Sequence, residues 1–264
     1  MLLYLVNAPF GYLLFGLLCF AWRRDPARRA ARLQRITSRA YRLMHDWIDL
    51  VGVTRFDWRT ALPELPQGAC VVVANHPTLM DVTAVSAAIG GGVTIAKPAM
   101  FRRSALRPLL VSAGHVEGPG GDSGSIGRVI EEAVERLGRG LPLIVFPEGT
   151  RTVPGQPVTF GRLAFEIACR ARVPVVALGI RCDPPYCTKQ VSPWWPPDPT
   201  PVLALELLGI HDPLNFDGNS RRMTMELQQL YRDRLGDACL VVDASPRYGR
   251  WIARHACPTS SKTA

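Results

Sequence analysis

The sequence lacks any arrangement of cysteines that would support a disulfide framework or a zinc site. Its seven cysteines are an odd number, they are scattered along the chain, and the closest pair, Cys182 and Cys187, has no matching pair elsewhere. We therefore expect small buried thiols in a reducing compartment. The sequence also lacks zinc-finger spacing, a leucine zipper and an aromatic-and-basic RNA-binding signature, so we expect no nucleic-acid partner.

Acidic residues are too few to balance the basic ones, and the net charge is +9. A balance of this size favours a partner rich in negative charge, either nucleic acid or anionic lipid headgroups. The chain has 264 residues, 47% of them hydrophobic, which is enough for one domain with its own core. Arginines crowd residues 23–42, directly after a long apolar stretch, as is typical of a segment beside a membrane. The charge therefore indicates membrane lipids as partners.

Residues 1–22 contain no charged side chain and are long enough to be a membrane-helix candidate, although Asn7 and Pro9 weaken a simple span. No positive residue precedes them and no cleavage site clearly follows, so a signal peptide is not favoured. Trp22 and the arginines after it predict an anchor at the cytoplasmic face of the cell membrane. Apolar residues recur at helical spacing among arginines over 26–51, which predicts a basic amphipathic helix lying in the membrane interface. The alternative is a surface helix that covers the core.

Short apolar runs alternate with helical patterns along the rest of the chain. Buried strands are expected at 69–74, 93–96, 141–146, 175–180 and 202–208. Helices are expected at 81–89, 104–113, 126–137, 162–172 and 218–235, with a flexible stretch at 118–127. This alternation predicts an α/β fold with a mostly parallel sheet flanked by helices, preceded by N-terminal membrane-associated helices. The expected parts are a membrane-associated helical segment at 1–52, a domain at 53–240 and a tail at 241–264.

The first candidate motif, Asn-His-Pro-Thr-Leu-Met-Asp at 75–81, follows the strand predicted at 69–74. Histidine accepts a proton near neutral pH, and a carboxylate on its other ring nitrogen fixes the tautomer and stabilises the imidazolium. Four residues between His76 and Asp81 allow the histidine to lie in a loop and the aspartate in the next helical turn. This spacing favours His76 as a general base that deprotonates a hydroxyl. The alternative is a structural role, in which Thr78 and Asp81 form a capping box.

The second candidate motif, Phe-Pro-Glu-Gly-Thr-Arg at 146–151, follows the strand predicted at 141–146. Gly149 allows the backbone to turn close to a ligand. Arg151 presents donors that suit a phosphate or carboxylate, and Glu148 can accept from a substrate hydroxyl or orient an arginine. The alternative is a strand-to-loop turn with a solvated salt bridge. Both motifs lie at predicted carboxyl ends of strands, where sites gather in open sheets of this kind.

Together the two motifs resemble the signatures of the lysophosphatidic acid acyltransferase family, within the glycerolipid acyltransferases. The resemblance covers roughly residues 70–182, and the N-terminal helices resemble the membrane-dipping pair of bacterial members. It implies His76 as the catalytic base and Asp81 as its partner, within an acyltransferase domain at 53–240. It also implies an acceptor site that is built from Glu148, Gly149, Thr150, Arg151, Lys97 and Arg162.

The resemblance implies a membrane-bound O-acyltransferase that moves a fatty acyl group from acyl-CoA or acyl-carrier protein to the free hydroxyl of a lysophospholipid. The first expectation for the acceptor is 1-acylglycerol-3-phosphate. Because the hydroxyl attacks the thioester directly, neither a metal nor another cofactor is expected.

Two departures from the family pattern remove positive charge from the expected acceptor pocket. An arginine is missing from the segment His115–Pro119, and Arg162 is a single cation where two are common. A less anionic acceptor, such as another lysolipid or a lipid-like natural product, is therefore an alternative. His115 is read either as part of the site or as a loop histidine. A third reading is a non-catalytic membrane lipid-binding module with the same fold.

Overall fold

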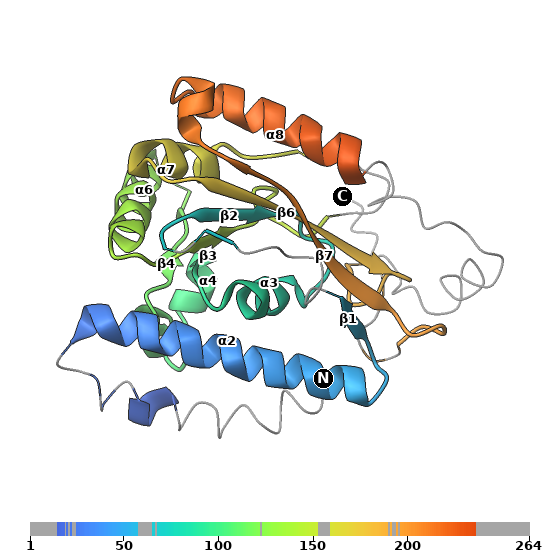
Figure 1. The fold of residues 1–264 in the computed structure, drawn as a ribbon. Helices are drawn as coiled ribbons and strands as arrows, with labels where there is room; N and C mark the ends of the chain where they lie inside the picture. The colour runs from blue at the N-terminus through green and yellow to red at the C-terminus, as the bar shows by residue number, and fades with distance from the viewer. Residues whose placement is uncertain are drawn as a thin grey trace, which may run out of the picture.

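The computed structural model describes residues 15–18, 20, 22, 25–57, 65–66, 68–121, 123–152, 159–189, 191, 194 and 196–235. Within these residues, a seven-stranded sheet lies between two layers of helices (Figure 1). Helices α6 (Ser123–Gly138), α7 (Leu163–Ala171) and α8 (Ser220–Leu235) cover one face of the sheet. Helices α2 (Pro26–Leu50) and α3 (Asp81–Ile89) cover the other face. The predicted α/β architecture is confirmed.

Most of the sheet is parallel. Its strands are β1 (Arg55–Asp57), β2 (Val71–Ala74), β3 (Val93–Ala96), β4 (Val116–Glu117), β5 (Leu143–Val145), β6 (Val175–Asp183) and β7 (Val202–His211). They are arranged in the order β1-β7-β6-β2-β5-β3-β4. The five strands from β6 to β4 are mutually parallel, β7 runs antiparallel to β6, and β1 pairs in parallel with β7. The carboxyl ends of β2, β5 and β3 therefore meet at one edge.

The centre of the sheet is buried on both faces because its strands are runs of apolar residues. All four residues of β2 are buried. Val71 and Val73 pack into the core under α6, α7 and α8, while Val72 and Ala74 pack into the core on the opposite face. This alternation follows from the two-residue period of a strand. It fixes β2 as the rigid base from which the first motif leaves the sheet.

The region between β3 and α6 differs from the sequence-based expectation. Besides α5 (Arg107–Ser112), which falls within the expected helix, the structure contains the short helix α4 (Pro98–Phe101) and the two-residue strand β4. The stretch 118–127 was expected to be flexible, but α6 already begins at Ser123. β4 forms only because Val116 and Glu117 find Ile95 and Ala96 of β3 as partners, which no local pattern could indicate.

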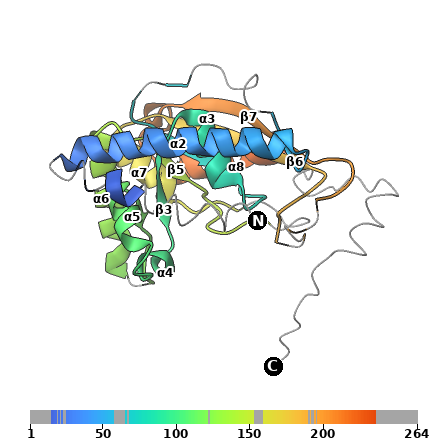
Figure 2. The same ribbon diagram turned by 90° about the horizontal axis from the view of Figure 1, so that it is seen from below.

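Helix α2 is built into the domain along one side, as Figure 2 shows from the side of this helix. Its Leu33 is fully buried, and its Gln34 donates Nε2 to the Ala113 carbonyl at 2.8 Å and accepts from the Gly92 N–H at 3.3 Å. A Cβ on Gly91 would lie 2.8 Å from the Gln34 carbonyl oxygen, so this glycine permits the close approach. The inner face of the amphipathic helix therefore covers the core.

The outer face of α2 retains exposed apolar side chains. Leu43, Trp47 and Leu50 are 70%, 43% and 82% exposed. A place in the membrane interface remains a prediction for this face. None of the helices in the described part of the chain is long and apolar enough to cross a membrane. Most of the apolar candidate segment 1–22 and the whole of the predicted tail 241–264 lie outside the described residues.

Candidate active site

The two sequence motifs meet at the carboxyl edge of the sheet. β2 and β5 are hydrogen-bonded neighbours, with Val73 opposite Val145. The chain leaves β2 into Asn75 and His76, and it leaves β5 into Phe146 and the second motif. Their distance in the sequence is about 70 residues, but the parallel pairing of β2 and β5 places both loops side by side.

His76 is joined to Asp81 by a short hydrogen bond, with 2.8 Å between Nδ1 and Oδ2. The same Oδ2 accepts from the Thr78 N–H at 2.7 Å, and Oδ1 accepts from the Thr78 hydroxyl at 2.5 Å. A carboxylate that accepts from both Thr78 donors presents a lone pair to His76, so Nδ1 carries the proton. The other ring nitrogen, Nε2, is then a free base. The His76 side chain is 19% exposed, which leaves it accessible to a substrate.

Asp81 is fully buried at the first position of α3. Burial raises the pKa of this carboxyl group above its usual value, because a charge is costly away from water. The hydrogen bonds from His76 and Thr78 oppose that rise. The charge on Asp81 therefore depends on its partners in this loop, and it is best stabilised when His76 is protonated.

The capping-box alternative is realised in part. Thr78 donates its N–H to Asp81, as a capping box requires, while its hydroxyl oxygen accepts from the Met80 N–H at 3.1 Å. The Asp81 carboxylate thus orders the turn that begins α3 and also orients the imidazole of His76. The structural and the chemical readings of this spacing are compatible.

The second motif holds the backbone of His76 on both sides. Glu148 Oε1 accepts from the His76 N–H at 3.1 Å, and the Thr152 N–H donates to the His76 carbonyl at 2.7 Å. The Thr152 hydroxyl donates to both carboxylate oxygens of Glu148, at 2.8 and 3.0 Å. The ring of Phe146 stacks on the imidazole with centroids 4.4 Å apart. The position of His76 is therefore set by residues far away in the sequence.

Glu148 contacts the backbone of the histidine loop rather than an arginine. Burial raises the pKa of its carboxyl group, and the hydrogen bonds from Thr152 and from the His76 N–H oppose the rise. The chain turns away directly after it, because Gly149 adopts φ +66°, a conformation that glycine tolerates best. Thr150 lies exposed at the tip of this turn.

Arg151 reaches the loop that follows β6. Its Nη1 donates to the carbonyls of Cys187 at 3.3 Å and Thr188 at 3.2 Å. The Cys187 carbonyl also accepts from the N–H of Leu79, at 2.9 Å. One carbonyl group thus connects the first motif, the second motif and the loop after β6.

Several residues that order the site were not singled out in the sequence. Thr152 lies one position beyond the second motif, and the carbonyls of Cys187 and Thr188 carry no side-chain signature. Asn75 exchanges two hydrogen bonds with the backbone of Ile180, at 2.7 and 2.8 Å, which ties the start of the first motif to β6. Asn75 is the first residue of the motif that the sequence already indicated, whereas the only signal for Thr152 was a polar residue directly after a motif at a strand end.

Lys97 and Arg162 lie further from the histidine. Lys97 is exposed at the start of α4, directly after β3 and two strands away from β2. Arg162 precedes α7 and forms an exposed ion pair with Glu166 at 3.7 Å. Among the described residues, the hydrogen-bond network around His76 includes neither cation.

His115 accepts a hydrogen bond at Nδ1 from the backbone N–H of Thr94, at 3.0 Å. Burial lowers its pKa to about 4, so this histidine is neutral near pH 7. It therefore packs as an uncharged partner of β3. As to metals, no cluster of three or more His, Cys, Asp or Glu side chains suited to an ion occurs in the described ranges.

Comparisons with known proteins give one consistent family. Residues 58–181 match the model of the Acyltransferase family. Two curated proteins named 1-acyl-sn-glycerol-3-phosphate acyltransferase are similar: one from Cocos nucifera, 31% identical over 117 residues, and one from Chlamydomonas reinhardtii, 28% identical over 113 residues. These matches cover 44% and 43% of this chain but only 38% and 34% of the relatives, so the similarity spans little more than a third of their length.

A solved structure shares the fold. It is the crystal structure of the 1-acyl-sn-glycerophosphate acyltransferase PlsC from Thermotoga maritima, with a TM-score of 0.64 and 20% sequence identity. The match covers 90% of this chain and 93% of that one. The region matched by the family model contains both motifs, with His76 and Asp81 in the first and Glu148 in the second. Residues 58–181 are thus similar to the Acyltransferase family, and the chain shares the fold of that acyltransferase structure.

Proposed function

We propose that this protein is an O-acyltransferase that moves a fatty acyl group from acyl-CoA or acyl-carrier protein to the free hydroxyl of a lysophospholipid, first of all 1-acylglycerol-3-phosphate. The observation that carries the proposal is the 2.8 Å contact between His76 Nδ1 and Asp81 Oδ2, which leaves Nε2 as an accessible base. The family match and the names of the two curated relatives support the acyl-transfer chemistry.

The reaction is a single direct transfer. Nε2 of His76 removes the proton of the acceptor hydroxyl as its oxygen attacks the thioester carbonyl carbon. The carbon–sulfur bond then breaks, the acyl group stays on the oxygen, and the thiol leaves with the proton from the imidazolium. Asp81 stabilises the imidazolium between these two proton transfers. Glu148 and Thr152 keep His76 in place by holding its backbone.

Lys97 is the cation best placed for an acceptor phosphate. It follows β3 at the same edge of the sheet as His76, at a distance of two strand spacings, which is about 10 Å. The flexible four-carbon stem of lysine spans much of that distance. Arg151 has a different role in this proposal, because its Nη1 serves the loop after β6 and keeps the site assembled.

A less anionic acceptor is the second candidate, and one contact favours it. Ala96, the residue before Lys97, pairs with Glu117 across β3 and β4, so an acidic residue lies on the neighbouring strand. Gly118 follows, where the family pattern would lead us to expect an arginine nearby. An acidic residue near Lys97 disfavours a phosphate monoester with two negative charges more than it disfavours a zwitterionic or neutral headgroup.

We also propose that the protein works at the cytoplasmic face of the cell membrane. The exposed side chains of Leu43, Trp47 and Leu50 on α2 support this, because an apolar stripe beside arginines suits the interface of an anionic bilayer. At that surface the enzyme would find both the lysolipid and the product membrane.

The proposal is tested by an acceptor panel. The purified full chain is offered labelled long-chain acyl-CoA or acyl-carrier protein with 1-acylglycerol-3-phosphate, zwitterionic lysolipids and monoacylglycerol. We expect labelled product from the phosphate-bearing acceptor. Product from uncharged or zwitterionic acceptors alone would replace the leading acceptor by the second candidate, and binding of the thioester without transfer to any acceptor would favour a lipid-binding module.

Thr152→Val should reduce kcat by about tenfold or more, with little change in KM for the acceptor. The substitution removes the hydroxyl donor that the two oxygens of a partly buried carboxylate share, and it keeps the shape of the side chain. Such a hydrogen bond to a charged group contributes about 1.5–3 kcal/mol. Because this hydroxyl holds the pKa of Glu148 down, the acidic limb of the pH–rate profile should move to higher pH. Steady-state kinetics across pH measures both effects.

Thr152→Ser is the matched control, because serine keeps the hydroxyl and should restore the rate. A valine variant with wild-type kcat and an unshifted pH profile would show that Thr152 contributes only packing.

A further inference from the structure

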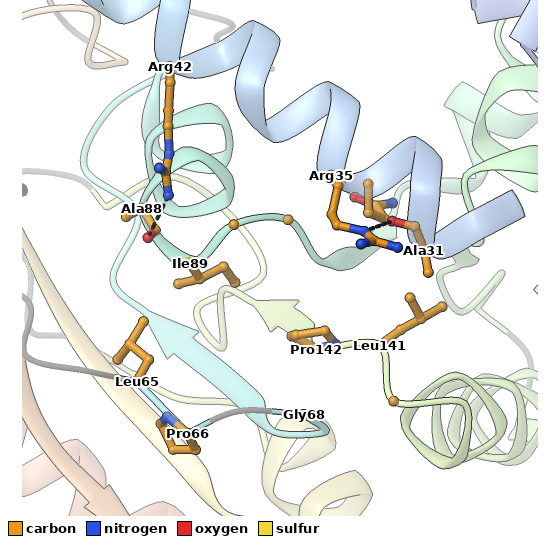
Figure 3. Close-up of a pocket in the computed structure, with 14 residues that line it drawn as sticks. Ala31, Arg35, Arg42, Leu65, Pro66, Gly68, Ala88, Ile89, Leu141 and Pro142 are labelled. Carbon is orange, nitrogen blue, oxygen red and sulfur yellow. Dashed lines mark hydrogen bonds between the residues drawn. The ribbon is translucent and has the colours of Figure 1, made fainter. Parts of the chain in front are cut away.

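A pocket of about 460 Å³ lies at the end of the sheet opposite His76. It is found where α2 crosses the amino-terminal ends of β2, β3 and β5, among Gly68, Gly91 and Pro142 (Figure 3). The segment from Gly68 to His76 runs through β2, and an extended segment of this length spans roughly 25 Å. The pocket is therefore a separate site from the acyl-transfer centre.

Two arginines of α2 supply the charge of this pocket. Arg35 and Arg42 are seven residues apart and lie on the same side of the helix, and both side chains extend toward the pocket in Figure 3. Arg42 donates Nε to the Ala87 carbonyl and Nη2 to the Ala88 carbonyl, which offsets the negative end of α3. Arg35 donates its Nε to the Ala31 carbonyl at 3.4 Å, which leaves both terminal nitrogens for a ligand.

The other lining residues in the described ranges are uncharged. The apolar part consists of Leu65, Pro66, Ala88, Ile89, Leu141 and Pro142. Among the described residues that line the pocket, none is acidic. A cavity with a positive side and an apolar side suits a ligand that carries an anionic group next to a hydrophobic one. A small free anion would leave the apolar side unused.

We propose that this pocket binds an anionic phospholipid of the membrane surface, with its phosphate on Arg35 and its apolar part against Ile89 and Leu141. The surroundings favour a lipid as the source of the phosphate, because the same helix exposes Leu43 and Trp47 to solvent. This inference rests on the membrane-surface part of the proposed function. It adds a lipid contact that orients α2 at the bilayer without taking part in catalysis.

The test measures lipid binding to the full chain without any turnover. Soluble dihexanoylphosphatidylglycerol and inorganic phosphate are titrated separately by calorimetry into wild type, Arg35→Gln and Arg39→Gln. Arg39 is the matched control, because it is an exposed arginine of the same helix that does not line the pocket. We expect Arg35→Gln to weaken binding of the phospholipid by about tenfold, the size of a charge-assisted contact. Arg39→Gln should weaken it by less than about twofold.

Equal losses in the two variants would overturn the proposal, since they would reflect the general charge of α2. Inorganic phosphate that binds wild type as tightly as the phospholipid would also overturn it, because the apolar side would then play no part. Cosedimentation with phosphatidylcholine vesicles, with and without phosphatidylglycerol, should show the same ranking of variants. Acyl transfer to soluble acceptors in detergent should be unchanged in Arg35→Gln, so a failure of the catalytic proposal and a failure of this one are distinguishable.

Discussion

Replacing His76 with alanine is expected to lower kcat for acyl transfer by about 10²–10⁴-fold, the range that a positioned general base contributes. The physical reason is that Nε2 is the free base left by the bond between Nδ1 and Asp81. KM for the acceptor should change little, because the imidazole acts on the proton and not on the headgroup. Single-turnover transfer of a labelled acyl group measures the chemical step directly.

His115→Asn is the matched control for this variant. It removes a second histidine, while the asparagine oxygen can still accept from the N–H of Thr94. We expect a rate close to that of wild type, because His115 serves as an uncharged partner of β3. A folded His76→Ala variant with wild-type turnover would exclude the proposed mechanism. An inactive His115→Asn variant with an intact fold would bring this histidine into the site.

Asp81→Asn should lower kcat by about 10- to 100-fold, less than the loss of His76. Two donors, Thr78 N–H and His76 Nδ1, point at the Oδ2 position, so the amide oxygen of asparagine should take that place. The amide nitrogen then faces the Thr78 hydroxyl, which can rotate to accept. His76 keeps its tautomer and orientation and loses only the negative charge beside the imidazolium, which corresponds to about 1.5–3 kcal/mol.

Comparison of Asp81→Ala with Asp81→Asn separates the effect of the negative charge from the effect of orienting His76. Both variants lack the charge. Asp81→Ala also removes the acceptor that orients His76 and orders the turn before α3, so its kcat should approach that of His76→Ala. Burial raises the pKa of Asp81, so the ionised carboxylate carries a desolvation cost in the folded protein at pH 7. The thermal midpoint of Asp81→Asn should therefore stay near that of wild type. A rate in Asp81→Asn as low as in Asp81→Ala would mean that asparagine, besides lacking the charge, also fails to hold the tautomer and orientation of His76.

Local patterns in the sequence were sufficient to predict most helices and strands of the domain. The helix expected at 81–89 was found there because a buried apolar run ends at three glycines, and the strand at 93–96 was found because its apolar run is short and bounded. The first motif was also readable as a unit, since His76 and Asp81 lie within one loop and one helical turn. Their contact lies within one motif, and the spacing indicated it beside the alternative of a capping box.

Strand pairing could not be predicted from local patterns in the sequence. β7 was expected as a strand over 202–208, but its length to His211 and its antiparallel direction depend on pairing with β6. β4 exists only through its pairing with β3. Short strands have little intrinsic stability, so the partner decides whether and where they form.

The sequence by itself determined the alternation of strands and helices and the closeness of His76 and Asp81, because both follow from periodicity and short spacing. The acyltransferase interpretation came from the resemblance of the two motifs to a known family. The tertiary structure decided what surrounds that pair. Only the adjacency of β2 and β5 brings Glu148 and Thr152 onto the backbone of His76, and only the path after β6 brings the Cys187 carbonyl to Arg151. The pocket beneath Arg35 depends likewise on how closely α2 crosses Gly91. Contacts between residues distant in sequence carry no local pattern, because the energy that selects them arises only when the sheet is assembled.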